Sequence, residues 1–274
     1  MSVDKASERP ARERDFWNER VRHDAAEALL TDYRVGPEDR CDRAIPWLPY
    51  IGMPAYVDRV IAELGDISGR AVLDIGAGTG FMTALLAARG ADVDAVDVAE
   101  ESLARCAMRV RLSGVSSAVR LHCMAGERLA FPNCRFDRVV GVFVLHHLDL
   151  TAALAEIHRV LRPGGIAIFI ETWGRNPILM LARRLLTGHF GIDKAGSDDE
   201  QPLGWAARRL LARGPFVEVR YLFPELLFWR MLGYVPLARG PAARAAWRAA
   251  DLTLGKLAVL RTFSYFCVVV LRKR

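Results

Sequence analysis

The sequence contains no apolar run of the ~20 residues that a membrane-spanning helix needs. Its longest runs, such as FSYFCVVVL at 263–271, have the length of a buried strand. The first residues, MSVDKASERPARERD, carry too many charges for a secretion signal. We therefore expect a cytoplasmic protein without a spanning segment.

Cysteine is also scarce, and its spacing argues against two kinds of site. The five cysteines never form a C-x-x-C pair, which is the spacing typical of zinc sites and redox motifs. Scattered thiols fit a reducing compartment better than a disulfide framework. We expect neither a metal site nor structural disulfides.

Lysine is nearly missing, since only four of the 38 Lys and Arg residues are lysine. The charge is also unevenly distributed. From Arg175 onward, 17 basic residues stand against 7 acidic ones (+10), whereas residues 1–174 hold 21 basic and 25 acidic residues (−4). Two interpretations fit: a solvated arginine-rich surface, or a C-terminal third that faces an anionic partner such as a membrane surface or an acidic substrate.

Strand-like and helical segments alternate through the middle of the chain. Helical patterns separate most of the apolar, strand-like segments. The helix after the fourth strand-like segment is expected to run to Pro163 and the two glycines that follow it. This alternation predicts an α/β fold with a parallel sheet covered on both faces. The strand-like segments are 71–76, 92–98, 118–124, 136–145 and 166–173.

The first strand leads into VLDIGAGTG, residues 72–80, where three glycines stand on alternate positions behind an acid. The dinucleotide fingerprint G-x-G-x-x-G does not fit, because its last position would be Phe81 or Thr83. The Gly-Lys-Ser/Thr of a P-loop does not follow either. The remaining pattern, D-x-G-x-G-x-G, lets a ligand approach the backbone closely. Asp97, about twenty residues further on at the end of the next strand, can accept hydrogen bonds from both hydroxyls of a ribose.

With these motifs the sequence resembles the class I S-adenosylmethionine-dependent methyltransferases, specifically the bacterial group that acts on small molecules. The resemblance covers about residues 70–173, through VLDIGAGTG, VDAVDVAEESL, ERLAFPNCRFDRVVGVFVLHHL and LAEIHRVLRPGGIAIFIETWGRNP. It implies a Rossmann-like seven-stranded sheet, mostly parallel with an antiparallel last strand. It also implies S-adenosylmethionine as cofactor and S-adenosylhomocysteine as product.

The same resemblance assigns residues to the cofactor. The acid and glycines of the first motif would line its methionine part, the end of the second strand its ribose, and the end of the fourth strand its methyl group. The family's acid for the adenine amino group falls at Ala125, which leaves backbone groups around Ala125 and Gly126 to hold adenine. The assigned residues are Asp74, Gly76, Gly78, Gly80, Asp97, Val98, Ala125, Gly126, Phe143 and Val144.

Three residues are candidates for the chemistry. Methyl transfer from a sulfonium is an in-line displacement, so alignment of the acceptor provides much of the catalysis. His146 and His147 follow the fourth strand and could take a proton from the acceptor, since histidine ionises near pH ~6.5. Glu171 ends the fifth strand at the same crevice. The alternatives are structural: a histidine that caps or underlies the next helix, and a carboxylate that anchors a loop.

The expected organisation is a helical cap (1–69), an S-adenosylmethionine-binding core (70–174) and the rest of the sheet with an inserted helical substrate lid (175–274). Aromatic residues after position 200, such as Trp205, Tyr221 and Trp229, could line an acceptor pocket in this lid. They favour a methyltransferase that acts on a small, apolar acceptor of specialised or lipid-like metabolism. The alternatives are an RNA (tRNA) methyltransferase and a non-catalytic S-adenosylmethionine-binding partner protein. Dispersed arginines and the lack of an RNA-binding motif argue against nucleic acid.

Basic and apolar residues also occur together in the C-terminal third, at ILMLARRLL (178–186) and LFPELLFWRMLGYV (222–235). Such segments suit a peripheral membrane helix, a lid over an acidic apolar substrate, or a buried helical layer. The sequence alone favours the cytosolic lid over membrane contact.

Overall fold

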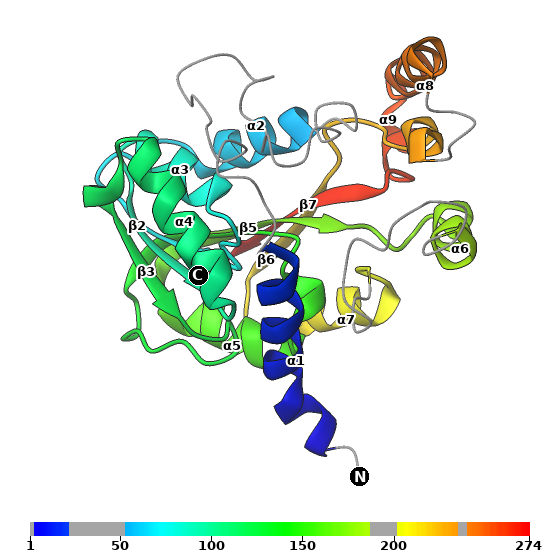
Figure 1. The fold of residues 1–274 in the computed structure, drawn as a ribbon. Coiled ribbons are helices and arrows are strands. Elements are labelled where there is room, and N and C mark those ends of the chain that lie inside the picture. Colours follow the sequence, from blue (N-terminus) through cyan, green and yellow to red (C-terminus); the bar gives the residue numbers. More distant parts are fainter. Residues whose placement is uncertain (1–2, 22–52, 187–201, 235–239) are drawn as a thin grey trace.

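The computed structural model describes residues 3–21, 53–186, 202–234 and 240–274. Its centre is a seven-stranded sheet with the order β3-β2-β1-β4-β5-β7-β6 (Figure 1). Strands β1 to β5 are parallel, whereas β7 is antiparallel to both of its neighbours, which confirms the predicted sheet. The strands are β1 (Ala71–Ile75), β2 (Asp92–Asp97), β3 (Val119–Cys123), β4 (Phe136–Val142), β5 (Leu161–Thr172), β6 (Glu218–Leu222) and β7 (Phe266–Arg272).

Helices cover both faces of the sheet, as the strand–helix alternation predicts. The α-helices are α1 (Val3–Val21), α2 (Met53–Leu64), α3 (Phe81–Ala88), α4 (Glu100–Leu112), α5 (Leu150–Val160), α6 (Pro177–Leu186), α7 (Trp205–Arg213), α8 (Pro241–Leu254) and α9 (Ala258–Arg261). Short 3-10 helices are η3 (Ser116–Ala118), η4 (Leu145–His147) and η5 (Trp229–Tyr234). None of the helices within these described ranges is long and apolar enough to span a membrane.

The core has two apolar layers, one on each side of the sheet. Successive strand residues point to opposite faces, so Ile168 packs with α2 and α3 while Phe169 packs with α5 and α7. Every residue of β1 is buried. This continuous burial is what a parallel strand covered on both faces requires.

Two boundaries differ from the predicted ones. The helix expected to reach Pro163 ends at Val160, and β5 begins at Leu161. Proline disfavours helical backbone at the residue before it, so Arg162 is already extended. Residues 162–165 form an irregularity in the β4–β5 pairing, which resumes at Arg138 and Ile166. The fourth strand stops at Val142 rather than running to 145, because Phe143 adopts a positive φ of 53°.

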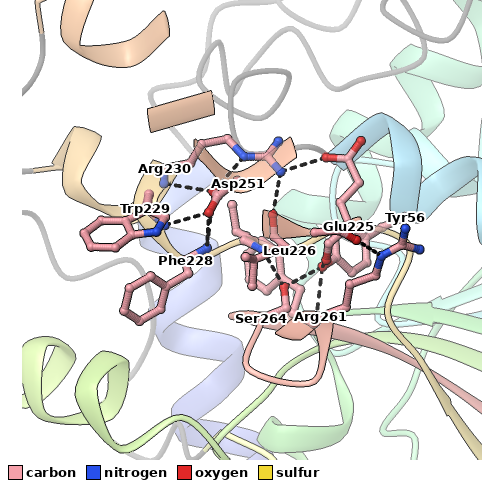
Figure 2. Close-up of polar contacts among 12 residues, drawn as sticks. Tyr56, Glu225, Leu226, Phe228, Trp229, Arg230, Asp251, Arg261 and Ser264 are labelled. Carbon is pink, nitrogen blue, oxygen red and sulfur yellow. Dashed lines mark hydrogen bonds and ion pairs between the residues drawn. The ribbon is translucent and has the colours of Figure 1, made fainter. Parts of the chain in front are cut away.

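The segment between β6 and β7, residues 223–265, is called the lid here as a label for its place in the chain only; residues 235–239 lie outside the described ranges. A group of buried polar side chains attaches it to the sheet (Figure 2). Asp251 accepts N–H groups from Phe228, Trp229 and Arg230 and pairs with the Arg230 guanidinium at 3.0 Å. Both of these charged side chains are almost fully buried.

A second part of this group connects the lid to α2. The Tyr56 hydroxyl lies 2.8 Å from Ser264 Oγ and 3.2 Å from the carbonyls of Glu225 and Phe266, either of which can accept its single O–H. Ser264 Oγ also accepts Leu227 N–H. The division of the chain into three parts stays a prediction, and residues 22–52 of the expected cap lie outside the described ranges.

Candidate functional site

The three glycines after β1 adopt positive φ angles, but they do so for different reasons. An added Cβ at Gly76 would lie 2.5 Å from Val144 Cγ2, and one at Gly80 would overlap Cys106. At Gly78, which has a φ of 52°, a Cβ would meet nothing within 4 Å. Two glycines therefore make room for the protein's own side chains. Only Gly78 borders open space that a ligand can occupy.

The glycine loop is held in place by its neighbours. The N–H groups of Gly76 and Ala77 both donate to Val96 O at the end of β2. From α4, the fully buried Arg109 donates its Nε–H to Thr79 O at 2.8 Å. The sequence analysis did not single out Arg109. The available signal was its position, since it lies on the same face of α4 as the buried Cys106 and Val110.

Asp97 ends β2 directly beside Gly78. Its Oδ2 accepts Gly78 N–H at 2.8 Å, and its Oδ1 accepts Ala99 N–H at 2.8 Å. Burial raises the pKa of Asp97 above its usual value, although these backbone donors and the nearby His147 act in the opposite direction. Each carboxylate oxygen retains acceptor capacity, because an ionised carboxylate offers about four lone-pair sites. Val98, the next residue, is half-buried at the same strand end.

Asp74 lies inside the protein beneath the loop rather than on its surface. Its carboxylate is almost fully buried and accepts the Thr83 hydroxyl at 2.6 Å. Burial raises the pKa of Asp74 to about 7. In this position Asp74 ties β1 to the first turn of α3. The Asp74 side chain has no solvent-facing surface through which to line the methionine part of a cofactor.

The segment after β3 contains the residues expected near adenine. Met124 N–H donates to Asp97 O, which places Ala125 beside the end of β2. Gly126 is buried, and an added Cβ there would lie 3.0 Å from Ile75 and 3.1 Å from Leu148. Glu127 makes a different contact: its Oε1 accepts the N–H of Asp149, the residue before α5, at 2.9 Å.

The turn after β4 has an unusual backbone. Phe143, with its positive φ, donates its N–H to Ile170 O and packs its ring 4.8 Å from that of Phe266. Left-handed backbone is costly for a bulky residue and marks a position that the surroundings hold in place. Val144, which fills the space left by Gly76, links this turn to the glycine loop.

Glu171 is the residue that holds this turn. Its fully buried carboxylate accepts the N–H groups of Val144 and Leu145, at 3.0 and 2.7 Å, through Oε1. The other oxygen lies 2.5 Å from His146 Nδ1. Glu171 therefore anchors a loop, which was the structural alternative for this residue, and it orients the His146 ring. Glu171 has no exposed atom that could contact an acceptor directly.

His147 lies against the N-terminal helix. Its Nδ1 is 3.1 Å from Glu13 Oε2, an approach that is not aligned for a hydrogen bond, and its ring meets that of Trp17 edge to face. Arg9 of the same helix donates to the carbonyls of His146 and Leu148. Helix α1 therefore covers the Leu-His-His turn. The sequence analysis did not predict these contacts, because nothing in α1 itself indicates which turn it covers.

The site residues that follow β1, β2, β3 and β4 thus meet at the carboxyl ends of these strands, where ligands bind in open α/β sheets. Residues 73–169 match the sequence family described as a methyltransferase domain. This match covers 97 of the 274 residues, so this part of the chain is similar to a methyltransferase domain. The four described cysteines are free, and among the described residues no group of three or more His, Cys, Asp or Glu could hold a metal ion.

Curated proteins similar to this part of the chain include ubiquinone biosynthesis O-methyltransferases. The one from Pseudomonas aeruginosa (strain UCBPP-PA14) is 36% identical over 120 residues, which are 43% of this chain and 50% of the relative. The one from Psychrobacter arcticus is 33% identical over 118 residues, 42% of this chain and 45% of the relative. The chain therefore spans about half the length of the curated relatives that it matches.

Solved structures share the fold over most of the chain. A geranyl diphosphate C-methyltransferase from Streptomyces coelicolor, in complex with Mg²⁺, geranyl-S-thiolodiphosphate and S-adenosyl-L-homocysteine, has a TM-score of 0.58 at 13% identity, with 97% of this chain and 98% of that chain covered. A SAM-dependent methyltransferase from Aquifex aeolicus has a TM-score of 0.55 at 18% identity, covering 88% and 100%. These likenesses confirm the expected Rossmann-like fold with its seven-stranded sheet.

Proposed function

We propose that the protein is an S-adenosylmethionine-dependent methyltransferase that acts on a small, apolar acceptor in the cytoplasm. The observation that carries this proposal is the pairing of Gly78 with Asp97. The only motif glycine with open space beside it donates its N–H to the acid at the end of β2. A ribose hydroxyl bound by Asp97 would lie over a stretch of backbone that carries no side chain. The match of residues 73–169 to a methyltransferase domain supports the same cofactor.

The residues present fit this cofactor in specific ways. Gly78 and the free lone pairs of Asp97 would hold the ribose end, the backbone at Ala125 and Gly126 would border adenine, and Phe143 would border the methyl group. When bound, the cofactor supplies an electrophilic methyl group on a sulfonium. Asp74, Gly76 and Gly80 would contribute by shaping the loop, since Asp74 bonds to Thr83 and an added Cβ at the two glycines would meet Val144 and Cys106.

His146 is our candidate for the base if the acceptor must lose a proton. With Nδ1–H directed at the Glu171 carboxylate, a neutral His146 would carry its proton-accepting lone pair on Nε2. The His146 side chain is only 2% exposed, so this role requires the acceptor to reach it inside the site. Glu171 is then a positioning residue that fixes the tautomer and the ring. We would test an acceptor hydroxyl first, because the curated relatives are O-methyltransferases by name.

The cofactor assignment is tested by calorimetric titration with S-adenosylhomocysteine. Gly78→Ala should weaken binding at least tenfold, because its Cβ would occupy the ligand's space. Gly114→Ala is a matched control: Gly114 also has a positive φ and nothing within 4 Å of an added Cβ, but it lies beyond the end of α4. Both substitutions carry a similar backbone strain. Undetectable binding by the parent, or an equal loss in both variants, contradicts the assignment.

The acceptor class is tested separately, with radiolabelled methyl groups on S-adenosylmethionine and a cell extract. A small apolar acceptor carries the label into the organic phase. Label that stays with acid-precipitable RNA instead supports an RNA methyltransferase, and strong salt dependence would accompany it. Tight product binding without transfer to any component of the extract supports a non-catalytic binding protein.

A further inference from the structure

Exposed apolar side chains are concentrated on one part of the described surface. Large apolar residues that are exposed singly are common in proteins, whereas a contiguous group marks an interaction site. Of the twelve exposed ones, eight lie on α6 and in the segment 252–263 that contains α9. They are Ile178, Leu181, Leu185, Leu252, Leu254, Leu257, Val259 and Phe263, and are called the apolar rim below.

The two segments of the apolar rim are neighbours in space. Asn176, just before α6, donates its Nδ2–H to Phe263 O at 2.7 Å, and Arg183 of α6 donates to the Tyr265 hydroxyl at 2.6 Å. Figure 1 shows α6, α8 and α9 together at one end of the molecule, beyond β5 and β7. Within α6, Ile178, Leu181 and Leu185 follow the spacing of one helical face. That face points to solvent, while Leu179 is buried.

The charge around the apolar rim has one sign. The described residues 173–186 and 240–263 contain the exposed bases Arg175, Arg184, Arg244, Arg248 and Lys256. Their only acid is Asp251, which is buried and paired with Arg230. The face that exposes these apolar side chains therefore also carries positive charge with no exposed acid among its described residues.

We propose that the apolar rim docks on the surface of an anionic phospholipid membrane. Exposed aliphatic and aromatic side chains beside arginines are the combination that a peripheral membrane surface needs. These side chains do not belong to a buried helical layer, since they are 38–67% exposed. A substrate lid would direct them inward, toward the site. RNA would match the charge but not the apolar side chains.

The position of the apolar rim suits an acceptor drawn from a bilayer. It lies where β5 leads into α6 and the chain re-enters the sheet at β7, at the same edge of the sheet as the methyltransferase site. Phe266, the first residue of β7, touches Phe143 of that site. The choice of an apolar acceptor rests on the proposed function, whereas membrane docking itself needs no cofactor. The two proposals can therefore fail separately.

The test is flotation of the full-length protein, without cofactor, with vesicles of phosphatidylcholine alone or mixed with phosphatidylglycerol. We expect binding to the anionic vesicles only, weakened by salt. Arg248→Ala with Lys256→Ala should lower the vesicle affinity about 25-fold, because each basic residue near such a surface contributes about fivefold, or about 1 kcal/mol. Leu257→Ser with Val259→Ser should lower it at least tenfold, since both side chains are mostly exposed.

A double variant on α4 is the matched control. Arg111→Ala with Leu112→Ser removes one exposed base and one exposed apolar side chain away from the apolar rim, and should leave vesicle binding unchanged. Circular dichroism checks that every variant is folded. Equal flotation with both vesicle types, or equal loss in rim and control variants, overturns the proposal. So does a dimer that Leu257→Ser with Val259→Ser dissociates, or rim-dependent retention of bulk tRNA without vesicle binding.

Discussion

The glycine loop and the lid are both held by buried polar groups, but over very different distances along the chain. At the loop, Asp74 bonds to Thr83 and Asp97 to Gly78, residues that lie within about one strand–helix unit of each other. In the lid, Asp251 also bonds to nearby residues, 228–230, but Tyr56 reaches Ser264, 208 residues away. Local sequence can build the loop and the Asp251 contacts, whereas the contact between Tyr56 and Ser264 forms only when α2 and the lid meet in the folded chain.

The two regions also differ in what fills their interior. Around the loop, continuous apolar strands pack against helices on both faces. In the lid, α8 exposes most of its surface and buries Asp251, a charged residue, against Arg230. Breaking such a buried pair leaves an uncompensated charge, so the lid depends on single polar residues to a degree that the apolar core does not.

The largest expected effect comes from breaking that pair. Asp251→Ala removes the partner of Arg230 and the acceptor of three backbone N–H groups, which should lower the free energy of opening the lid by about 3–5 kcal/mol. Hydrogen exchange should show faster exchange across 223–265, with β1 to β4 still protected. Asp66→Ala is the control and should change this exchange little. Asp66 is an exposed acid that accepts only Ser68 N–H among the bonds described. Loss of β1 to β4 at the same denaturant concentration would show that the two regions unfold as one.

A pH experiment sharpens the comparison on the loop side. The pKa of Asp74 is raised to about 7, above the ~3.9 of an unfolded chain. Between these values the folded protein holds more protons on this group, so its contribution to stability falls as pH rises from about 4 to 7 and is constant above that range. Asp74→Asn should remove this slope, a difference of up to about 4 kcal/mol across the window. Parallel stability curves for parent and variant, measured by urea unfolding, would contradict the burial of this carboxylate.

The smallest effect is expected from Tyr56→Phe. This change removes one buried hydroxyl and leaves its partners unsatisfied, which should destabilise the protein by about 1–3 kcal/mol. A double-mutant cycle with Ser264→Ala distinguishes the contact from a general loss of packing. The two changes should be non-additive by about 0.5–3 kcal/mol, whereas simple additivity would mean that the hydroxyls do not interact.

The sequence predicted the sheet well because its signals are local. The complete burial of β1 follows directly from its mostly apolar residue pattern. The same kind of local signal indicates the candidate site, which stays a prediction, since Gly78, Asp97 and the turn at Phe143 lie at or just after strand ends. The roles of individual residues were less accessible. Gly76 and Gly80 accommodate Val144 and Cys106, which come from elements that only the folded sheet brings near.

Glu171 and Arg109 show the same limit. Each is a charged residue in an apolar pattern, and only the fold shows that one anchors the Leu-His-His turn and the other the glycine loop. The exposure of the apolar rim was equally hidden, since ILMLARRLL is compatible with a buried layer, a lid or a docking face. A pattern of apolar residues defines a face of a helix but not what that face meets.

The place of β7 in the sheet has a consequence for biosynthesis. β6 is translated before β7, yet among the described strands it pairs only with β7, which lies between it and β5. Residues 223–265 must therefore leave the ribosome before either strand edge finds its partner. At ordinary elongation rates of about 5–20 residues per second, the nascent chain carries two open strand edges for several seconds. We therefore expect this topology to make the chain depend on chaperones more during translation than during refolding of the finished chain.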